Sequence, residues 1–89
     1  MNIAVFDTHV VRPDGRKMHF DILVRDRAND KEQSIVLEHG RRYLAAKGIP
    51  ASHLTASECR FCHIETASPQ VEAEINETGF AIIELKNCD

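Results

Sequence analysis

The sequence has no tryptophan, only one tyrosine, and no apolar stretch of the length that a membrane requires. A transmembrane helix needs about 20 consecutive, mainly apolar residues. The first residues also carry no positive charge before Asp7, which is not typical of a secretory signal peptide. These absences predict one domain, residues 1–89, that resides in the cytoplasm and has no membrane partner.

An excess of positive charge is missing as well. The chain holds 11 Lys and Arg against 14 Asp and Glu, for a formal net charge of −3. Its basic runs are as short as Arg16-Lys17 and Arg41-Arg42. Because binding driven by phosphate contacts depends on clustered Lys and Arg, the sequence gives no clear indication of a nucleic-acid partner.

Cysteine is scarce, and the number of cysteines is odd. The chain contains Cys59, Cys62 and Cys88, with no spacing that suggests a disulfide framework. In a reducing compartment such residues are expected to be free thiols or metal ligands.

A β-hairpin is predicted at the start of the chain. Residues 2–12 and 17–24 alternate in the manner of strands, and Arg12-Pro13-Asp14-Gly15 favours a turn. If Gly15 takes the left-handed conformation, Arg12 pairs with Arg16. His9 then faces His19, Asp7 faces Asp21 and Val5 faces Leu23. One face of the hairpin is predicted to enter the core: Ala4, Phe6, Thr8, Val10, Met18, Phe20, Ile22 and Val24. The other face carries Asp7, His9, His19 and Asp21.

A first helix is predicted over residues 31–47. Asp30 and Gln33 have the spacing of a capping box, and Gly48 is suited to end the helix. Gly40 lowers helix stability by about 1 kcal/mol relative to Ala, so we expect it to allow close packing on the sheet. The predicted inner stripe consists of Ile35, Val36, Gly40, Tyr43, Leu44 and Ala46.

Two further strands and a second helix follow. Residues 59–64 are expected to be extended. The second helix should start at Ser68-Pro69 and end at Gly79. Residues 80–85 are almost continuously apolar, which is typical of a central strand buried on both faces. The order β-β-α-β-α-β predicts an α+β fold with one four-stranded mixed sheet packed by two helices.

The segment from Glu58 to Glu65 is the densest in groups that can do chemistry. It contains the pattern C-x-x-C-H, which is used for haem attachment. A cytoplasmic chain rich in strands does not fit that use. A thioredoxin-like redox pair requires the start of a helix. An extended segment instead puts Cys59, Phe61 and His63 on one face, with Cys62 on the other.

A zinc ion is the candidate cofactor of this segment. Zinc needs four ligands, and Cys59, Cys62 and His63 could supply three if the chain bends between the two cysteines. Cys88 or His19 could complete the set. The alternative is that the two cysteines are small core residues and that His63 binds a carboxylate.

The polar face of the hairpin is the second candidate site. Its carboxylates and imidazoles could bind a divalent metal or form an acid–base pair. The alternative is a solvated outer face of a sheet. The candidate ligand-binding residues, for a small ligand of unknown identity, are Asp7, His19, Asp21, Glu58 and Arg60.

Two blocks of this sequence are specific, Met18-His19-Phe20-Asp21 and Glu58-Cys59-Arg60-Phe61-Cys62-His63. Together with Ala4-Val5-Phe6-Asp7-Thr8 they resemble a family of small bacterial proteins known as a domain of unknown function. The resemblance covers nearly the whole chain and implies a small α+β fold without an assigned activity. It also implies an aromatic residue such as Tyr at the position of His9. The preferred ligands are therefore Asp7, His19, Asp21, Cys59, Cys62 and His63.

Three functions agree with these patterns. The first is a module that binds a metal or a small polar ligand. The second is an interaction module without a catalytic site, whose acidic helix around Glu72, Glu74 and Glu77 would meet a basic partner. The third is a thiol-dependent enzyme, with Cys62 or Cys59 as nucleophile and His63 or His19 as base. An edge strand of the hairpin could also pair with its copy in a homodimer.

Overall fold

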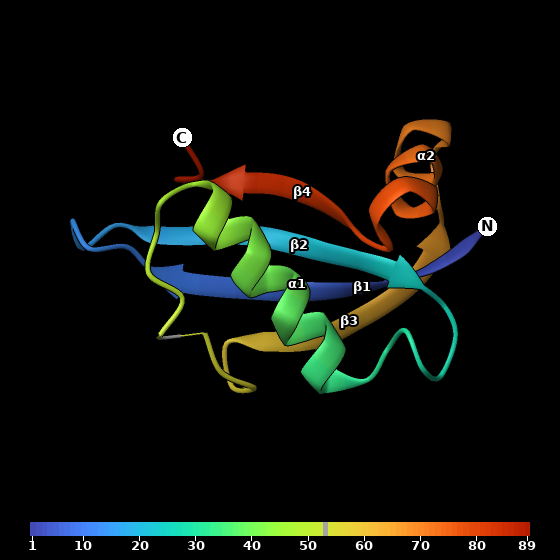
Figure 1. Ribbon diagram of the computed structural model, residues 1–89, viewed down its shortest axis with the longest axis horizontal. Helices are drawn as coiled ribbons and strands as arrows, with labels where there is room; N and C mark the ends of the chain where they lie inside the picture. Colours follow the sequence, from blue (N-terminus) through green and yellow to red (C-terminus); the bar gives the residue numbers. More distant parts are fainter. Residues whose placement is uncertain (53) are drawn as a thin grey trace.

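The computed structural model describes residues 1–52 and 54–89, and it places two helices against one four-stranded sheet (Figure 1). The α+β class and the predicted order of the elements are confirmed. In chain order they are β1 (Asn2–Val11), β2 (Lys17–Arg25), α1 (Gln33–Ala46), β3 (Cys59–Thr66), α2 (Pro69–Thr78) and β4 (Ala81–Lys86).

The hairpin of β1 and β2 has the predicted register. Asp7 pairs with Asp21 and His9 with His19. The Arg12 N–H donates to the Arg16 carbonyl at 2.8 Å, and Gly15 has a φ of 87°, which residues with a Cβ rarely adopt. The face predicted to enter the core is buried at all eight positions: Ala4, Phe6, Thr8, Val10, Met18, Phe20, Ile22 and Val24.

The hairpin forms the centre of the sheet, whose strand order is β3-β1-β2-β4 (Figure 1). All three pairings are antiparallel, so the prediction of a mixed sheet is wrong. After α1 the chain returns on the far side of β1, and β1 separates β2 from β3.

Strand β4 is also not the central strand that was predicted. It pairs with β2 alone and lies at an edge, where Ile83 is 39% and Leu85 is 51% exposed. A continuous apolar run is typical of burial on both faces, but it does not fix the position of a strand within the sheet.

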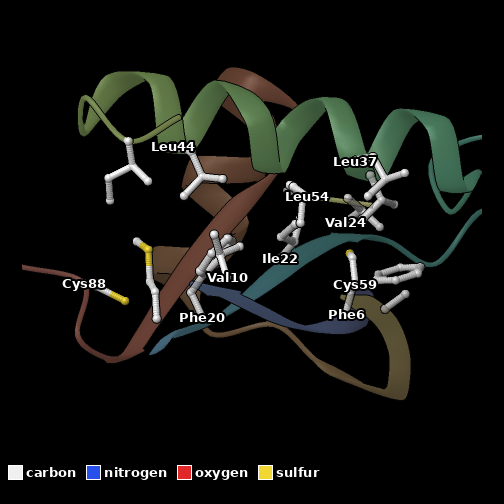
Figure 2. Close-up of a cluster of buried hydrophobic side chains, with 14 residues drawn as sticks. Phe6, Val10, Phe20, Ile22, Val24, Leu37, Leu44, Leu54, Cys59 and Cys88 are labelled. Atoms are coloured by element: carbon white, nitrogen blue, oxygen red, sulfur yellow. The ribbon is translucent and has the colours of Figure 1, made fainter. Parts of the chain in front are cut away.

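The two helices cover opposite faces of the sheet. Val36, Leu37 and Leu44 of α1 pack in one cluster with the buried face of the hairpin. Figure 2 shows this layer, with Leu54 between α1 and the sheet and with Cys59 and Cys88 at opposite ends. On the other face, Val71 and Ile75 of α2 pack in a second cluster with Ile3, Val5, Leu23 and Ala81.

Helix α1 ends as predicted but starts differently. Gly48 has a φ of 72°, and the Ile49 N–H donates to the Leu44 carbonyl at 2.9 Å, which is a Schellman ending. The N-cap position is held by Glu32 without a side-chain hydrogen bond. The predicted capping box is therefore wrong: Asp30 instead lies 3.9 Å from Arg25 as an ion pair.

The inner stripe of α1 is partly as predicted. An added Cβ at Gly40 would lie 2.7 Å from Leu54 Cδ2 and 3.0 Å from Ile22 Cδ1, so this glycine does allow close packing. Ile35 and Ala46 are exposed, however, and Leu37 is buried in their place.

Helix α2 has the predicted bounds. Ser68 Oγ accepts a hydrogen bond from the Val71 N–H at 3.2 Å, Pro69 occupies the first turn, and Gly79 ends the helix with a φ of 93°. Within the part of the chain that the structure describes, neither helix has the length and apolar character needed to cross a membrane.

A candidate metal site on the open face of the sheet

Helix α2 covers only one end of its face of the sheet. Residues alternate between faces along a strand, so the uncovered end is defined by the register. We call this surface the open face, and its residues are Asp7, His9, His19, Asp21, Arg60, His63, Ile83 and Lys86. It gathers side chains from all four strands.

Asp7 lies between two imidazoles on this open face. Its Oδ2 is 3.1 Å from His9 Nε2, and its Oδ1 makes a short contact with His19 Nε2. His9 and His19 are cross-strand partners, and their rings are stacked with centroids 4.2 Å apart and planes 14° from parallel. The hairpin register therefore brings two ring nitrogens to one carboxylate.

The two carboxyl groups of the open face differ in acidity. Burial raises the pKa of Asp7, but the hydrogen bonds and charges of His19 and His9 outweigh this effect and lower it overall. Burial also raises the pKa of Asp21, and the neighbouring Asp7 carboxylate raises it further. Asp7 therefore ionises first, and Asp21 holds its proton to a higher pH.

These three groups form a candidate set of metal ligands. Asp7, His9 and His19 can each direct one ligand atom so that all three atoms lie within 4.8 Å of one another. The side chains are 39%, 57% and 30% exposed, so solvent reaches them. Two imidazoles and one carboxylate suit first-row transition metals such as zinc and iron, and three protein ligands leave coordination positions open.

The structure does not bring the predicted metal ligands Cys59, Cys62 and His63 together. Cys59 is buried on the α1 side of the sheet, where Thr8 Oγ1 donates to its Sγ at 3.4 Å. His63 is on the open face, 3.6 Å from Glu65 Oε2, and Cys62 is exposed. The prediction that Cys59 and His63 share a face is wrong. The pairing of β1 with β3 shifts by one residue between Val5 and Phe6. Cys62 is therefore an extra residue in β3, a β-bulge without a partner in β1, and the faces of the following residues change.

The environment of Cys59 is that of a core residue. Burial raises the pKa of its thiol, and this effect outweighs the hydrogen bond from Thr8. Cys88 is buried at the other end of the same layer, where its Sγ donates to the His19 carbonyl at 3.3 Å. A thiol with a raised pKa forms little thiolate, so Cys59 is poorly suited to act as a nucleophile.

The predicted ligand-binding residues are separated into two places. Asp7, His19 and Asp21 lie together, and Arg60 is the cross-strand partner of Asp7. Glu58 is apart from them, where it accepts hydrogen bonds from the hydroxyls of Ser57 and Thr55 that lower its pKa.

A groove of about 880 Å³ follows the edge of β1 beyond the start of β3. Its lining includes His9 through Pro13 from the hairpin, and Pro50, Ser52 and Glu58 from the connection to β3. His9 belongs both to this groove and to the three candidate metal ligands. The groove thus adjoins the candidate metal site.

His9 is the site residue that the family resemblance set aside. The resemblance implies an aromatic residue at this position, which argued against a ligand. The hairpin register, in contrast, already places His9 opposite His19, and that signal was sufficient to include it.

Comparisons with known proteins agree with the fold. A family model described as a domain of unknown function (DUF2024) matches residues 1–85. The chain is also similar to the NMR structure of protein NE1680 from Nitrosomonas europaea, a target of the Northeast Structural Genomics Consortium. That similarity has 36% sequence identity, a TM-score of 0.82, and coverage of 100% of both chains. No curated protein matches the chain.

Proposed function

The chain belongs to the family described as a domain of unknown function (DUF2024), and we propose that it is a metal-binding module. The ion would be a divalent transition metal, held on the open face by Asp7, His9 and His19. The observation that supports this proposal is the convergence of three ligand atoms of the right chemistry within 4.8 Å.

The acidities on the open face support an ion at this place. The lowered pKa of Asp7 keeps its carboxylate charged, as a metal ligand must be. Asp21, whose pKa is raised by burial and by the Asp7 carboxylate, is a second carboxyl group beside the proposed ion.

The free coordination positions would face solvent and the adjoining groove. The sequence suggested zinc for Cys59, Cys62 and His63, which the structure separates. Imidazole with carboxylate suits zinc as well, and also iron, nickel and copper. A small polar ligand in the groove beside His9 could reach an open position on the ion. Glu58, on the groove wall, would then contact the ligand and not the metal.

Zinc titration of untagged protein tests this proposal. We expect one equivalent of zinc per chain, measured by isothermal titration calorimetry. His9→Ala and His19→Ala should each weaken binding by more than about tenfold, the scale found even for outer-shell residues of metal sites. His63→Gln is the matched control, because this histidine lies on the same face but outside the trio.

Two results would contradict the proposal. One is wild-type protein that takes up no zinc. The other is binding that depends on His63 as strongly as on His9, which would favour a different ligand set.

We also propose a cytoplasmic location. The sequence supports this, because its three cysteines lack the spacing of a disulfide framework typical of secreted proteins. Trapping of thiols in intact cells with a membrane-permeable alkylating agent tests this: the cysteines should be recovered reduced, and recovery as disulfides would argue against it.

A further inference from the structure

Among residues 1–52 and 54–89, no helix or strand covers the outer edge of β3. Strand β3 lies at an edge of the sheet, and all seven of its residues after Cys59 are exposed. Helix α1 packs on β2, and α2 packs on β2 and β4. Two large apolar side chains remain in solvent on this strand, Phe61 at 53% and Ile64 at 41% exposure. An exposed edge strand with apolar residues is a template for pairing with another strand.

The opposite edge of the sheet is better protected. Strand β4 has six residues against eight in β3. Its Glu84 is engaged by the hydroxyl of Tyr43 and by Lys47, and Lys86 adds a further charge. Strand β4 also exposes two large apolar side chains, Ile83 and Leu85. It is the shorter strand, however, and its Glu84 is held by contacts within the chain, so pairing is less favourable at this edge.

We propose that the outer edge of β3 pairs in antiparallel fashion with the same edge of a second copy of this chain. One register makes the strand complementary to itself. In it Phe61 lies opposite Ile64 of the second copy, and Arg60 lies opposite Glu65 of the second copy. Each pair occurs twice because of the two-fold symmetry. An apolar pair and an oppositely charged pair thus form on each side of the axis.

The faces of the strand agree with this register. Phe61 and Ile64 pair with Phe6 and Ala4 of β1, so both point to the α1 side. Arg60 and Glu65 pair with Asp7 and Ile3, so both point to the opposite side. In a regular strand, residues 61 and 64 would point to opposite faces. The extra residue at Cys62 is what makes the strand self-complementary.

A neighbouring register is less favourable. A shift by two residues places Phe61 opposite Cys62 and Arg60 opposite His63 of the second copy. It therefore loses both the apolar pair and the oppositely charged pair. The register in which Arg60 meets Glu65 is favoured because it keeps both.

The dimer would contain one continuous sheet of eight strands, four from each copy. Its two-fold axis is perpendicular to the sheet, so both open faces lie on the same side. This inference does not depend on metal binding.

Interfaces of one strand pair are small, and those that bury less than roughly 1,200 Å² belong to weak complexes. We therefore expect a reversible dimer that forms in the micromolar range.

Sedimentation velocity of the full chain, from low micromolar to near-millimolar concentration, tests the proposal. The wild type should shift from monomer to dimer. Arg60→Glu and Glu65→Arg each create two like-charged pairs and should raise the dissociation constant by at least about tenfold. The double variant exchanges the charges and should restore the wild-type constant. Leu85→Lys, on the edge formed by β4, is the control and should change nothing.

The exposed thiol of Cys62 supplies a second measurement. Cys62 faces His63 of the second copy in the proposed register and lies next to the two-fold axis. A short bismaleimide should therefore link two chains at Cys62, and Cys62→Ser should abolish the link. Cys59 and Cys88 are buried, so they do not compete for the reagent.

The proposal is overturned if the wild type stays monomeric at every concentration. It is also overturned if neither single charge substitution changes the dissociation constant of the dimer, or if Leu85→Lys raises that constant. The charge variants are at exposed positions, and a circular dichroism spectrum like that of the wild type shows that they fold.

Discussion

The two faces of the hairpin come from the same two strands, yet they differ in almost every physical property. One face carries eight buried residues packed under α1. The other is divided: Ile3, Val5 and Leu23 are buried under α2, and beyond them the open face carries two carboxyl groups and two imidazoles that solvent reaches. Alternation along a strand separates the two sets by a single residue step. The buried face stabilises the sheet, and the open face is therefore free to hold reactive groups that a core could not accept.

The largest effect is expected on the free energy of unfolding, when one residue of each face is replaced at adjacent positions of β2. Phe20 is fully buried, and its ring centroid lies 4.7 Å from that of Tyr43, so Phe20→Ala should lower the free energy of unfolding by about 3–5 kcal/mol. His19→Ala, one residue earlier but on the open face, should cost less than about 1 kcal/mol. Urea denaturation measures both values, and equal losses would argue against the division into two faces.

The three thiols should differ in reactivity according to whether they are buried or exposed. Cys62 is exposed, whereas Cys59 and Cys88 are buried. Iodoacetamide at neutral pH should modify Cys62 in the folded protein and reach the other two only when the chain opens. Mass spectrometry of digested samples taken over time measures each rate. Fast labelling of Cys59 would contradict the buried position and revive the thiol-enzyme hypothesis.

Tyr43, on the α1 side, should titrate abnormally. Burial, and then its hydrogen bond to Glu84, raise the pKa of this phenol well above its ordinary value. It is the only tyrosine and there is no tryptophan, so absorbance near 295 nm reports on it alone.

The raised pKa also has a consequence for stability. Because the folded state holds the phenolic proton more tightly, the stabilisation is complete below the unfolded pKa of about 10 and is lost as the pH rises above it. Tyr43→Phe should remove this part of the alkaline dependence. Ionisation of native Tyr43 near its ordinary pKa would contradict the contact with Glu84.

The smallest difference in stability is expected between substitutions at the starts of the two helices. Ser68 caps α2 with a hydrogen bond to the Val71 N–H, so Ser68→Ala should cost about 1 kcal/mol. Asp30 does not cap α1, and its ion pair with Arg25 is long. Asp30→Ala should therefore cost no more than about 0.5 kcal/mol. Thermal unfolding of both variants compares the two helix starts, and a larger loss at Asp30 would mean that it caps α1 after all.

Local patterns in the sequence were enough to predict the hairpin and α2. The turn at Arg12-Pro13-Asp14-Gly15 has one register that buries the apolar face, and the structure has that register. Ser68-Pro69 and Gly79 likewise specify both ends of α2. In these segments the determining interactions are between residues close in the chain.

Features that depend on distant parts of the chain could not be predicted in this way. The edge position of β4 is a matter of strand order, which its apolar composition does not specify. The extra residue at Cys62 arises where β3 meets β1, and it moved His63 away from the face of Cys59. The hairpin register was enough to place Asp7, His9, His19 and Asp21 on one face. Only the complete sheet showed that His63 shares this face and that Cys59 does not.

Zinc binding by the hairpin variants tests the central claim most directly. Calorimetric titration should show one ion per wild-type chain, marked weakening by His9→Ala and by His19→Ala, and no change with His63→Gln. If zinc does not bind, or if binding survives the loss of both His9 and His19, the open face is not a metal site.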